Sequence, residues 1–189
     1  MGKPYERITN ETEIFLEWMD VSGQNSIESP CGFFNHMFES MLYYSGLSIK
    51  LNARGDTHID HHHLVEDIGI LFGRAFRERF SDQPLKRFGS VIMPMDGSLV
   101  MVALDIGGRS GLFWNINFPT ERCGNFDLEI IREFWAAFTR EAKITIHFQQ
   151  ICADNSHHLA EAAFKGAGIA LKEALEPSKN LKSTKGTLN

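Results

Sequence analysis

Two short stretches of the chain, His62-His63-Leu64-Val65-Glu66 and His157-His158-Leu159-Ala160-Glu161, carry the same pattern, His-His-x-x-Glu. After each pair of histidines, apolar residues recur at the spacing of one face of an α-helix. Before each pair lies a short apolar or alternating stretch that is typical of a β-strand, at residues 47–51 and 144–148. Because internal similarity of this kind is the mark of a repeated unit, the two stretches predict a strand, loop and helix that occur twice.

The similarity extends over most of each half. Helices are predicted at residues 33–44 and 128–141, each after a Cys-Gly pair. Further strands are predicted at residues 13–19, 91–94, 99–105 and 112–117, near the turn signals Asp96-Gly97 and Gly107-Gly108. We therefore expect an α+β fold with an internal duplication, in which each half is an antiparallel sheet backed by helices and the two halves pack together.

The expected organisation has three parts. Residues 1–90 form the first sheet-and-helix half, residues 91–176 form the second half, and residues 177–189 form a C-terminal tail. The tail is rich in Ser, Lys, Thr, Gly and Asn, so its composition alone predicts disorder.

Length and composition exclude several classes of protein. With 189 residues, 43% of them hydrophobic, the chain can fill a core. Its 19 basic and 24 acidic residues give a net charge of −5, which argues against a nucleic-acid or membrane partner. No apolar run reaches the roughly 18 residues that span a bilayer, and the N-terminus lacks a secretory signal, so we expect a cytoplasmic protein. Cys31, Cys123 and Cys152 lack CxxC spacing, and we expect them to be reduced and packed.

The distribution of histidines indicates a metal site. All eight fall in three places: His36 in a predicted helix, a group at His58, His61, His62 and His63, and a group at His147, His157 and His158. Mixed imidazole and carboxylate ligands without thiolate suit Mn²⁺, Fe²⁺ or Zn²⁺. The alternative is that a His pair only forms a polar helix start, and that alternative explains one pair better than two pairs with the same Glu offset.

The spacing within each motif also constrains the site. At helical spacing, His62 or His63 can share a cation with Glu66, and His157 or His158 can do so with Glu161. Adjacent side chains on a helix point about 100° apart, so the two histidines of one pair are better placed to bind different metals.

In these motifs the chain resembles imidazoleglycerol-phosphate dehydratase, an enzyme family of histidine biosynthesis. The residues that carry the resemblance are Gly32-Phe33-Phe34-Asn35-His36-Met37, Gly55-Asp56-Thr57-His58-Ile59-Asp60, His62-His63 with Glu66-Asp67, Arg87-Phe88-Gly89, Asn155-Ser156-His157-His158 with Glu161-Ala162, Phe164-Lys165 and Ser183-Thr184-Lys185-Gly186. The resemblance covers essentially the whole chain, and these motifs in this order are distinctive.

The resemblance implies a fold, an assembly and a set of metal ligands. The fold would be a duplicated four-stranded sheet with helices, similar to domain 2 of ribosomal protein S5. The assembly would be a homo-oligomer of 24 subunits, with two Mn²⁺ ions in each active site and the sites shared between subunits. The metal ligands that the resemblance implies are His36, His62, His63, Glu66, His147, His157, His158 and Glu161.

The resemblance also implies a reaction. A phosphate ester that carries an imidazole ring and two hydroxyls, imidazole glycerol phosphate, would lose water to give imidazole acetol phosphate. Because the carbon that loses a proton has no neighbouring carbonyl, the ring must accept the electrons, and metals on the ring nitrogens would assist as Lewis acids. The implied substrate-binding residues are Glu11, Arg87, Arg109, Lys165, Ser183 and Lys185, and the implied catalytic residues are Glu11, Asp96, Glu66 and Glu161. The tail would then order on the phosphate or reach a neighbouring subunit.

Three positions depart from the family pattern, and two other functions compete. Asn35 and His61 stand where the family has Asp, and Gly97 replaces the Glu that usually follows Asp96. These changes remove negative charge near the predicted metals and leave the acid–base assignment open. A metal-dependent phosphoester hydrolase would use similar ligands but would release inorganic phosphate. A metal-holding shell protein without turnover would need none of the basic residues predicted to bind phosphate.

Overall fold

The first half of the chain forms a four-stranded sheet with two helices. The computed structural model describes residues 4–21 and 24–178. The strands are β1 (Tyr5–Ile8), β2 (Thr12–Trp18), β3 (Ser26–Glu28) and β4 (Ile49–Gly55), in the spatial order β1-β2-β4-β3. The helices are α1 (Gly32–Ser45) and α2 (His62–Phe80). Helix α2 follows β4 through the histidine-rich loop, as the sequence predicts.

The second half repeats this arrangement. Its strands are β5 (Phe88–Met95), β6 (Ser98–Asp105), β7 (Gly111–Asn115) and β10 (Thr145–Cys152), in the order β5-β6-β10-β7, and its helices are α3 (Ile130–Ala142) and α4 (Ser156–Ala174). Each strand therefore has a counterpart at the same place in the other sheet, which confirms the predicted duplication. A small hairpin, β8 (Arg122–Cys123) with β9 (Phe126–Asp127), is added before α3.

The prediction that both sheets are antiparallel is wrong. Strand β3 pairs with β4 in parallel, and β7 pairs with β10 in parallel. In each half a helix lies between the two parallel strands in the chain, and such a crossover returns the chain to the same end of the sheet. The sequence did not reveal β3 because this strand has only 3 residues and buries only Ile27 well.

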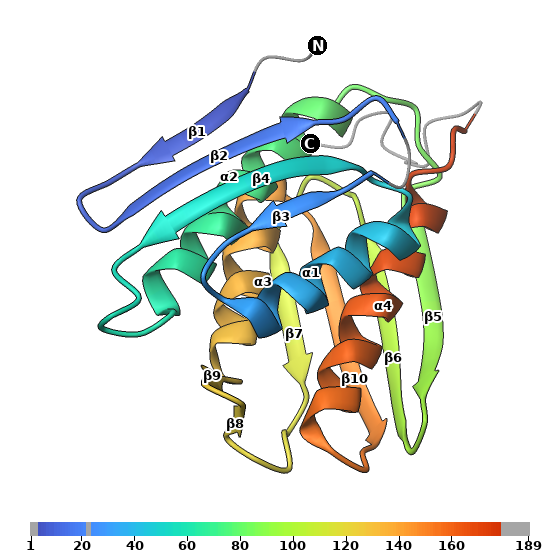
Figure 1. The fold of residues 1–189 in the computed structure, drawn as a ribbon. Helices are drawn as coiled ribbons and strands as arrows, with labels where there is room; N and C mark the ends of the chain where they lie inside the picture. Colours follow the sequence, from blue (N-terminus) through green and yellow to red (C-terminus); the bar gives the residue numbers. More distant parts are fainter. Residues whose placement is uncertain (1–3, 22–23, 179–189) are drawn as a thin grey trace.

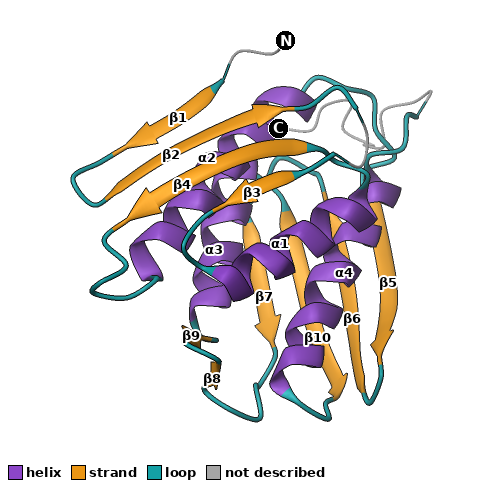
Figure 2. Ribbon diagram, viewed as in Figure 1, coloured by secondary structure: helices purple, strands orange, loops and turns teal. Residues whose placement is uncertain are grey.

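The four helices lie between the two sheets (Figures 1 and 2). Helices α1 and α2 cover one face of the first sheet, α3 and α4 cover one face of the second sheet, and α2 packs against α3 while α1 packs against α4. Phenylalanine rings from all four helices meet in this layer, among them Phe34, Phe38, Phe72, Phe134, Phe138 and Phe164. This shared core fixes the helix starts of the two halves relative to each other.

The boundary between the two halves lies before β5. The chain passes between the halves over residues 81–87, and residue 90 lies inside β5, a strand of the second sheet.

All three cysteines are free. Cys31 is buried, but Cys152 is exposed, so the expectation that all three are packed is wrong. Burial raises the pKa of the Cys31 thiol to about 11. Among the described residues, no helix is long and apolar enough to cross a membrane.

Candidate metal centre

Both histidine pairs lie in the first turn of a helix. In α4, the side chain of Asn155 caps the helix by accepting a hydrogen bond of 2.8 Å from the backbone N–H of His158. In α2, the Asp60 carboxylate accepts a hydrogen bond of 2.7 Å from the backbone N–H of His62. The rings of each pair diverge: their centroids are 6.1 Å apart at 80° in α2 and 6.2 Å apart at 88° in α4. The two histidines of a pair thus face different groups.

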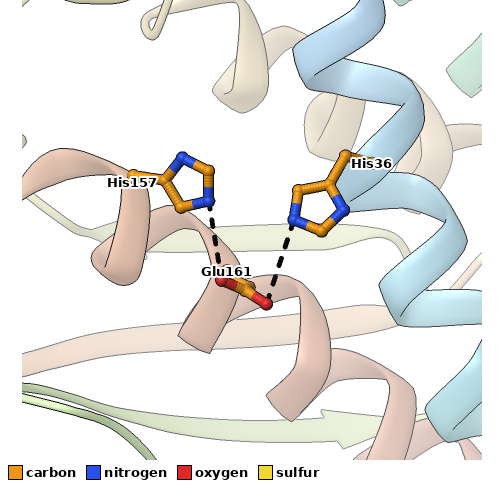
Figure 3. A group of neighbouring side chains, drawn as sticks. All are labelled: His36, His157 and Glu161. Atoms are coloured by element: carbon orange, nitrogen blue, oxygen red, sulfur yellow. Dashed lines mark ion pairs between the residues drawn. The ribbon is translucent and has the colours of Figure 1, made fainter.

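One cluster joins α1 to α4 and consists of His36, His157 and Glu161, which we call the α1–α4 cluster (Figure 3). Nε2 of His36 lies 4.0 Å from Oε1 of Glu161, and Nε2 of His157 lies 3.6 Å from Oε2 of the same carboxylate. The Glu161 side chain is only 9% exposed. Its Oε1 lies 2.8 Å from the ammonium group of Lys165. A nearly buried carboxyl group needs a polar or cationic partner, and Lys165 supplies one to Glu161.

The α1–α4 cluster fits a divalent cation. The separations between imidazole nitrogen and carboxylate oxygen are longer than hydrogen bonds. Two donor atoms that each lie about 2.1 Å from one cation are about 3.0 to 3.5 Å apart, so a small closure would give a ligand set. The donors are imidazole and carboxylate with no thiolate, which suits a borderline or hard divalent metal.

The corresponding pair in α2 is less complete. Nε2 of His62 lies 3.8 Å from Oε2 of Glu66, and Arg140 of α3 approaches the other carboxylate oxygen at 3.4 Å. Among the described side chains, no second imidazole joins this pair in the way that His36 joins His157. The α2 pair therefore presents an open side to its surroundings.

The second histidine of α2 is held by two carboxylates. Nδ1 of His63 lies 3.0 Å from Asp56, which follows β4, and 3.7 Å from Glu11, which lies in the turn between β1 and β2. The hydrogen bond with Asp56, with support from the charge of Glu11, raises the pKa of His63. His63, Asp56 and Glu11 form a second candidate cation group, but a cation bound there would have to replace the proton that Nδ1 of His63 shares with Asp56.

The second histidine of α4 has the same surroundings. Nδ1 of His158 lies 2.9 Å from Asp154, which follows β10, and Nε2 lies 3.5 Å from Asp96 in the turn between β5 and β6. The hydrogen bond with Asp154 raises the pKa of His158, and hydrogen bonds from Ser98 and His158 lower the pKa of Asp154 well below its usual range. The duplication thus brings each predicted turn acid, Glu11 or Asp96, beside a predicted metal ligand.

His147 lies away from both helix starts. It is exposed on β10, on the sheet face opposite the helices, and its ring stacks on Phe113 of β7 with centroids 4.2 Å apart. Neither candidate cation group among the described residues includes it. Within one subunit, His147 therefore lies apart from the predicted ligands at the two helix starts.

The predicted phosphate-binding residues are also divided within the subunit. Arg87, whose φ of 78° is unusual outside glycine, forms two hydrogen bonds of 2.5 and 2.9 Å with Asp105. Arg109 is exposed in the loop after β6, at the same end of the sheet. Lys165 of α4 lies near Met95 at the other end of β5, whereas the backbone N–H of Arg87 meets the C-terminal end of α4 at Ala174. Ser183 and Lys185 lie outside the described residues.

Two of the departures from the family pattern have structural partners of their own. Asn35 accepts a hydrogen bond from the Ser29 hydroxyl at 2.6 Å and donates one to the Ser29 carbonyl at 2.9 Å. An aspartate could not donate the second bond, so the amide ties the start of α1 to the loop before it. His61 is nearly buried at the start of α2 and stacks on Phe126 of β9.

Sequence reasoning missed several residues of these clusters. Asp56 and Asp154 bind the second histidine of each pair, and Arg140 binds Glu66. The position of each aspartate shortly before a His pair was a usable signal. Nothing in the sequence pointed to Arg140, because it reaches Glu66 only through the packing of α3 on α2.

Comparisons with known proteins agree on one family. A family model described as imidazoleglycerol-phosphate dehydratase matches residues 29–171. Relatives with that name include one from Cereibacter sphaeroides, 44% identical over 188 residues with 96% of each chain covered, and one from Magnetococcus marinus, 40% identical with 97% of this chain and 96% of the relative covered. A crystal structure of the protein of this family from Pyrococcus furiosus superposes with a TM-score of 0.85 at 36% identity, covering 96% of this chain and 99% of that one. The Staphylococcus aureus structure gives 0.83 at 35% identity, covering 94% and 100%.

Proposed function

The chain belongs to the imidazoleglycerol-phosphate dehydratase family, and we propose that it carries out this reaction with Mn²⁺ held by its duplicated histidine clusters. The activity is the dehydration step of histidine biosynthesis, in which the phosphate ester loses water and keeps its phosphate. The hydrolase and the shell protein without turnover are therefore not retained. The observation that carries the metal proposal is the α1–α4 cluster, where two imidazoles flank one nearly buried carboxylate.

The His-and-Glu pairs at the starts of α4 and α2 offer two positions for a metal ion. His157 with Glu161 and His36 would hold one ion, and His62 with Glu66 offers the same pair of donors on α2. When bound, the ions would act as Lewis acids that draw electrons into the imidazole ring of the substrate. The donor set suits Mn²⁺ but also other divalent metals, so the choice of Mn²⁺ rests on the family resemblance.

Glu11 and Asp96, the acidic residues in the two strand turns, would transfer protons in the reaction. Glu11 and Asp96 are 54% and 71% exposed at the side chain, and each lies next to a histidine that is predicted to bind metal, His63 or His158. A carboxylate at this edge can accept the proton that leaves carbon, while a second acid or water protonates the departing hydroxyl. We assign Glu11 and Asp96 to these steps without dividing the roles between them.

The active sites would lie between subunits. The α2 pair lacks a second imidazole, His147 lies on the far face of its sheet, and Lys165 is distant from Arg87. A closed homo-oligomer can place the same surfaces of different copies together at every interface. We therefore propose shared sites in an assembly of 24 subunits, with the tail residues Ser183 and Lys185 and the exposed Arg109 serving the phosphate. The cytoplasmic location remains a prediction.

A metal-replacement assay tests the proposed cofactor. The protein is stripped with a chelator, and formation of imidazole acetol phosphate is followed after addition of Mn²⁺, Zn²⁺ or buffer. We expect activity to be lost on stripping and restored by Mn²⁺. Full activity of stripped protein that contains no measurable metal would overturn the proposal, while activity restored only by Zn²⁺ would correct the metal.

A further inference from the structure

The surroundings of His158 show a carboxylate that is held in one orientation. Oδ1 of Asp154 accepts a hydrogen bond of 2.6 Å from the Ser98 hydroxyl and one of 2.8 Å from the backbone N–H of Asn155. Its other oxygen, Oδ2, faces Nδ1 of His158 at 2.9 Å. Because one oxygen is fixed by two donors, the other must point at the imidazole.

We propose that Asp154 is a positioning residue that keeps the proton of His158 on Nδ1, so that the lone pair of Nε2, which faces Asp96 at 3.5 Å, can bind a metal ion. This inference rests on the proposed metal-dependent function. A carboxylate can only accept, so Nδ1 must carry the proton that it shares with Asp154, and the lone pair is then on Nε2. A hydrogen bond of this kind from the second ring nitrogen is the usual way in which proteins orient a histidine that binds metal.

Asn155 offers the Nδ1 atom of His158 a second partner, and this partner favours the other tautomer. Its Nδ2 lies 2.7 Å from the same Nδ1 of His158, and its Oδ1 already accepts from the backbone N–H of His158. The amide nitrogen can only donate, so it favours the tautomer with a bare Nδ1 and a proton on Nε2. In that tautomer Nε2 has no lone pair with which to bind a metal ion. Asp154 and Asn155 therefore compete for Nδ1, and the charged acceptor makes the stronger hydrogen bond.

The first half of the chain repeats the arrangement with other residues. Asp56 follows β4 as Asp154 follows β10, and it lies 3.0 Å from Nδ1 of His63. Asp56 lies seven residues before His63 and Asp154 lies four residues before His158, so the two carboxylates reach Nδ1 from different positions of the repeat. Both halves nevertheless place a carboxylate on Nδ1 of the second histidine, which supports a role in the site.

Gly97 helps to fix the position of the Asp154 side chain. A Cβ atom at Gly97 would lie 2.7 Å from Cβ of Asp154, a distance that real side chains do not adopt. The glycine that departs from the family pattern therefore leaves room for Asp154 beneath the turn that carries Asp96. The same turn supplies Ser98, the hydroxyl donor to Asp154.

The test uses the isosteric variant Asp154→Asn in the full-length assembled protein. Since Ser98 and the Asn155 backbone keep an acceptor oxygen at the Oδ1 position, the new amide must present its NH₂ group to Nδ1 of His158. We expect the affinity for Mn²⁺, measured by calorimetry on stripped protein, to fall roughly 10- to 100-fold, as is typical when the partner of a metal-binding histidine is lost. Asp56→Asn should produce a similar loss, and Asp82→Asn, at an exposed acid after α2, should produce none.

Two further measurements separate positioning from structure. In ¹⁵N-histidine solid-state NMR of the stripped protein, one imidazole should move from the Nδ1-protonated to the Nε2-protonated form in Asp154→Asn. The Tm of the stripped variant should stay close to that of the wild type. Unchanged Mn²⁺ affinity, or a loss of affinity without a change of tautomer, would overturn the inference. If the wild type itself binds no divalent metal, both the inference and the proposed function fail, and the wild-type titration identifies that case.

Discussion

At the scale of single residues, Glu161 has the most constrained position in the candidate site. It is a nearly buried carboxylate that faces His36 and His157 and also bears the ammonium group of Lys165. Replacement of Glu161 would leave the largely buried ammonium group of Lys165 without its carboxylate partner. Glu161 is therefore the residue at which a small change should have the largest effect on metal binding.

Glu161→Gln should weaken Mn²⁺ binding by at least tenfold. The amide keeps the shape of the side chain but removes its charge, and the Lys165 ammonium, 2.8 Å away, then repels the incoming cation. The measurement is a calorimetric titration of stripped protein. Glu39→Gln is the matched control, because Glu39 is exposed on α1 one turn after His36. Equal affinity in the two variants would exclude Glu161 as a ligand.

Some contacts in the candidate site were predictable from the sequence and others were not. Spacing on a helix predicted that His62 or His63 can share a cation with Glu66, and that His157 or His158 can do so with Glu161. In the structure, His62 and His157 are the histidines that lie close to the glutamates. The helix period alone sufficed because these contacts are local. The contact of Asp56 with His63 depends on where a loop ends, and that of Glu11 depends on a turn between two strands, so the helix period could not predict either contact. The only sequence signal was the position of Asp56 shortly before the His pair.

At the scale of elements, close helix contacts depend on glycine. A Cβ atom at Gly69 of α2 would lie 2.7 Å from the backbone oxygen of Phe134 in α3. The two helices therefore approach each other at a distance that only glycine permits. The position of the α2 histidines relative to the second half depends on this contact.

Gly69→Ala should destabilise the protein although alanine favours helices by about 1 kcal/mol over glycine. The added methyl group must push α2 away from α3 and disturb the phenylalanine core, at a cost of about 2 kcal/mol or more. The comparison is the Tm of this variant with that of Gly32→Ala, since a Cβ at Gly32 meets nothing within 4 Å. A Gly69→Ala protein as stable as the wild type would contradict the described packing of α2 on α3.

The attachment of α4 to its sheet should depend on pH. Glu173 of α4 accepts hydrogen bonds from Lys86 at 2.9 Å and from the backbone N–H of Ser90 at 2.9 Å, and these bonds lower its pKa. Because the fold favours the charged form, the stabilisation is present above the pKa of the unfolded chain, about 4.3, and disappears as the pH falls through the lower pKa of the folded protein.

Glu173→Gln should therefore lower the Tm at pH 7, and the difference from the wild type should shrink towards pH 3. Thermal unfolding followed by circular dichroism at several pH values measures this. A difference in Tm that does not change between pH 7 and pH 3 would show that the charge of Glu173 is not what stabilises the contact.

The elements were predictable where the pattern was strong. The positions of α1, α3, β6 and β10 agree with expectation to within a few residues, because long amphipathic or alternating runs determine them. Strands β1 and β3 were missed, since they are short and mostly exposed or half-buried. The parallel pairing could not be inferred while β3 was missing, because it joins β3 to β4 across α1.

At the scale of the whole molecule, the duplication gives one subunit two similar sets of proposed metal ligands, each at a His-and-Glu helix start. Among the described residues, only the set of the second half has a third proposed ligand beside it, His36 from the first half. If other subunits complete these sets, metal ions should link the subunits. Metal removal should then reduce the mass of the particle in solution, as measured by light scattering, and Mn²⁺ should restore it. A mass that is the same with and without metal would contradict assembly through shared ligands.

The most direct test of the central claim, that the histidine clusters of different subunits form one active site, is complementation between two inactive variants. Glu161→Gln disables the α1–α4 cluster and Glu66→Gln disables the α2 pair. Co-expression with two different affinity tags, followed by purification on both, yields mixed oligomers whose dehydratase activity is measured with Mn²⁺. With shared sites, random mixing leaves about a quarter of the sites with both clusters intact, so activity should return to about that fraction of the wild-type value. Mixed oligomers as inactive as each variant alone would show that every site is built within a single subunit.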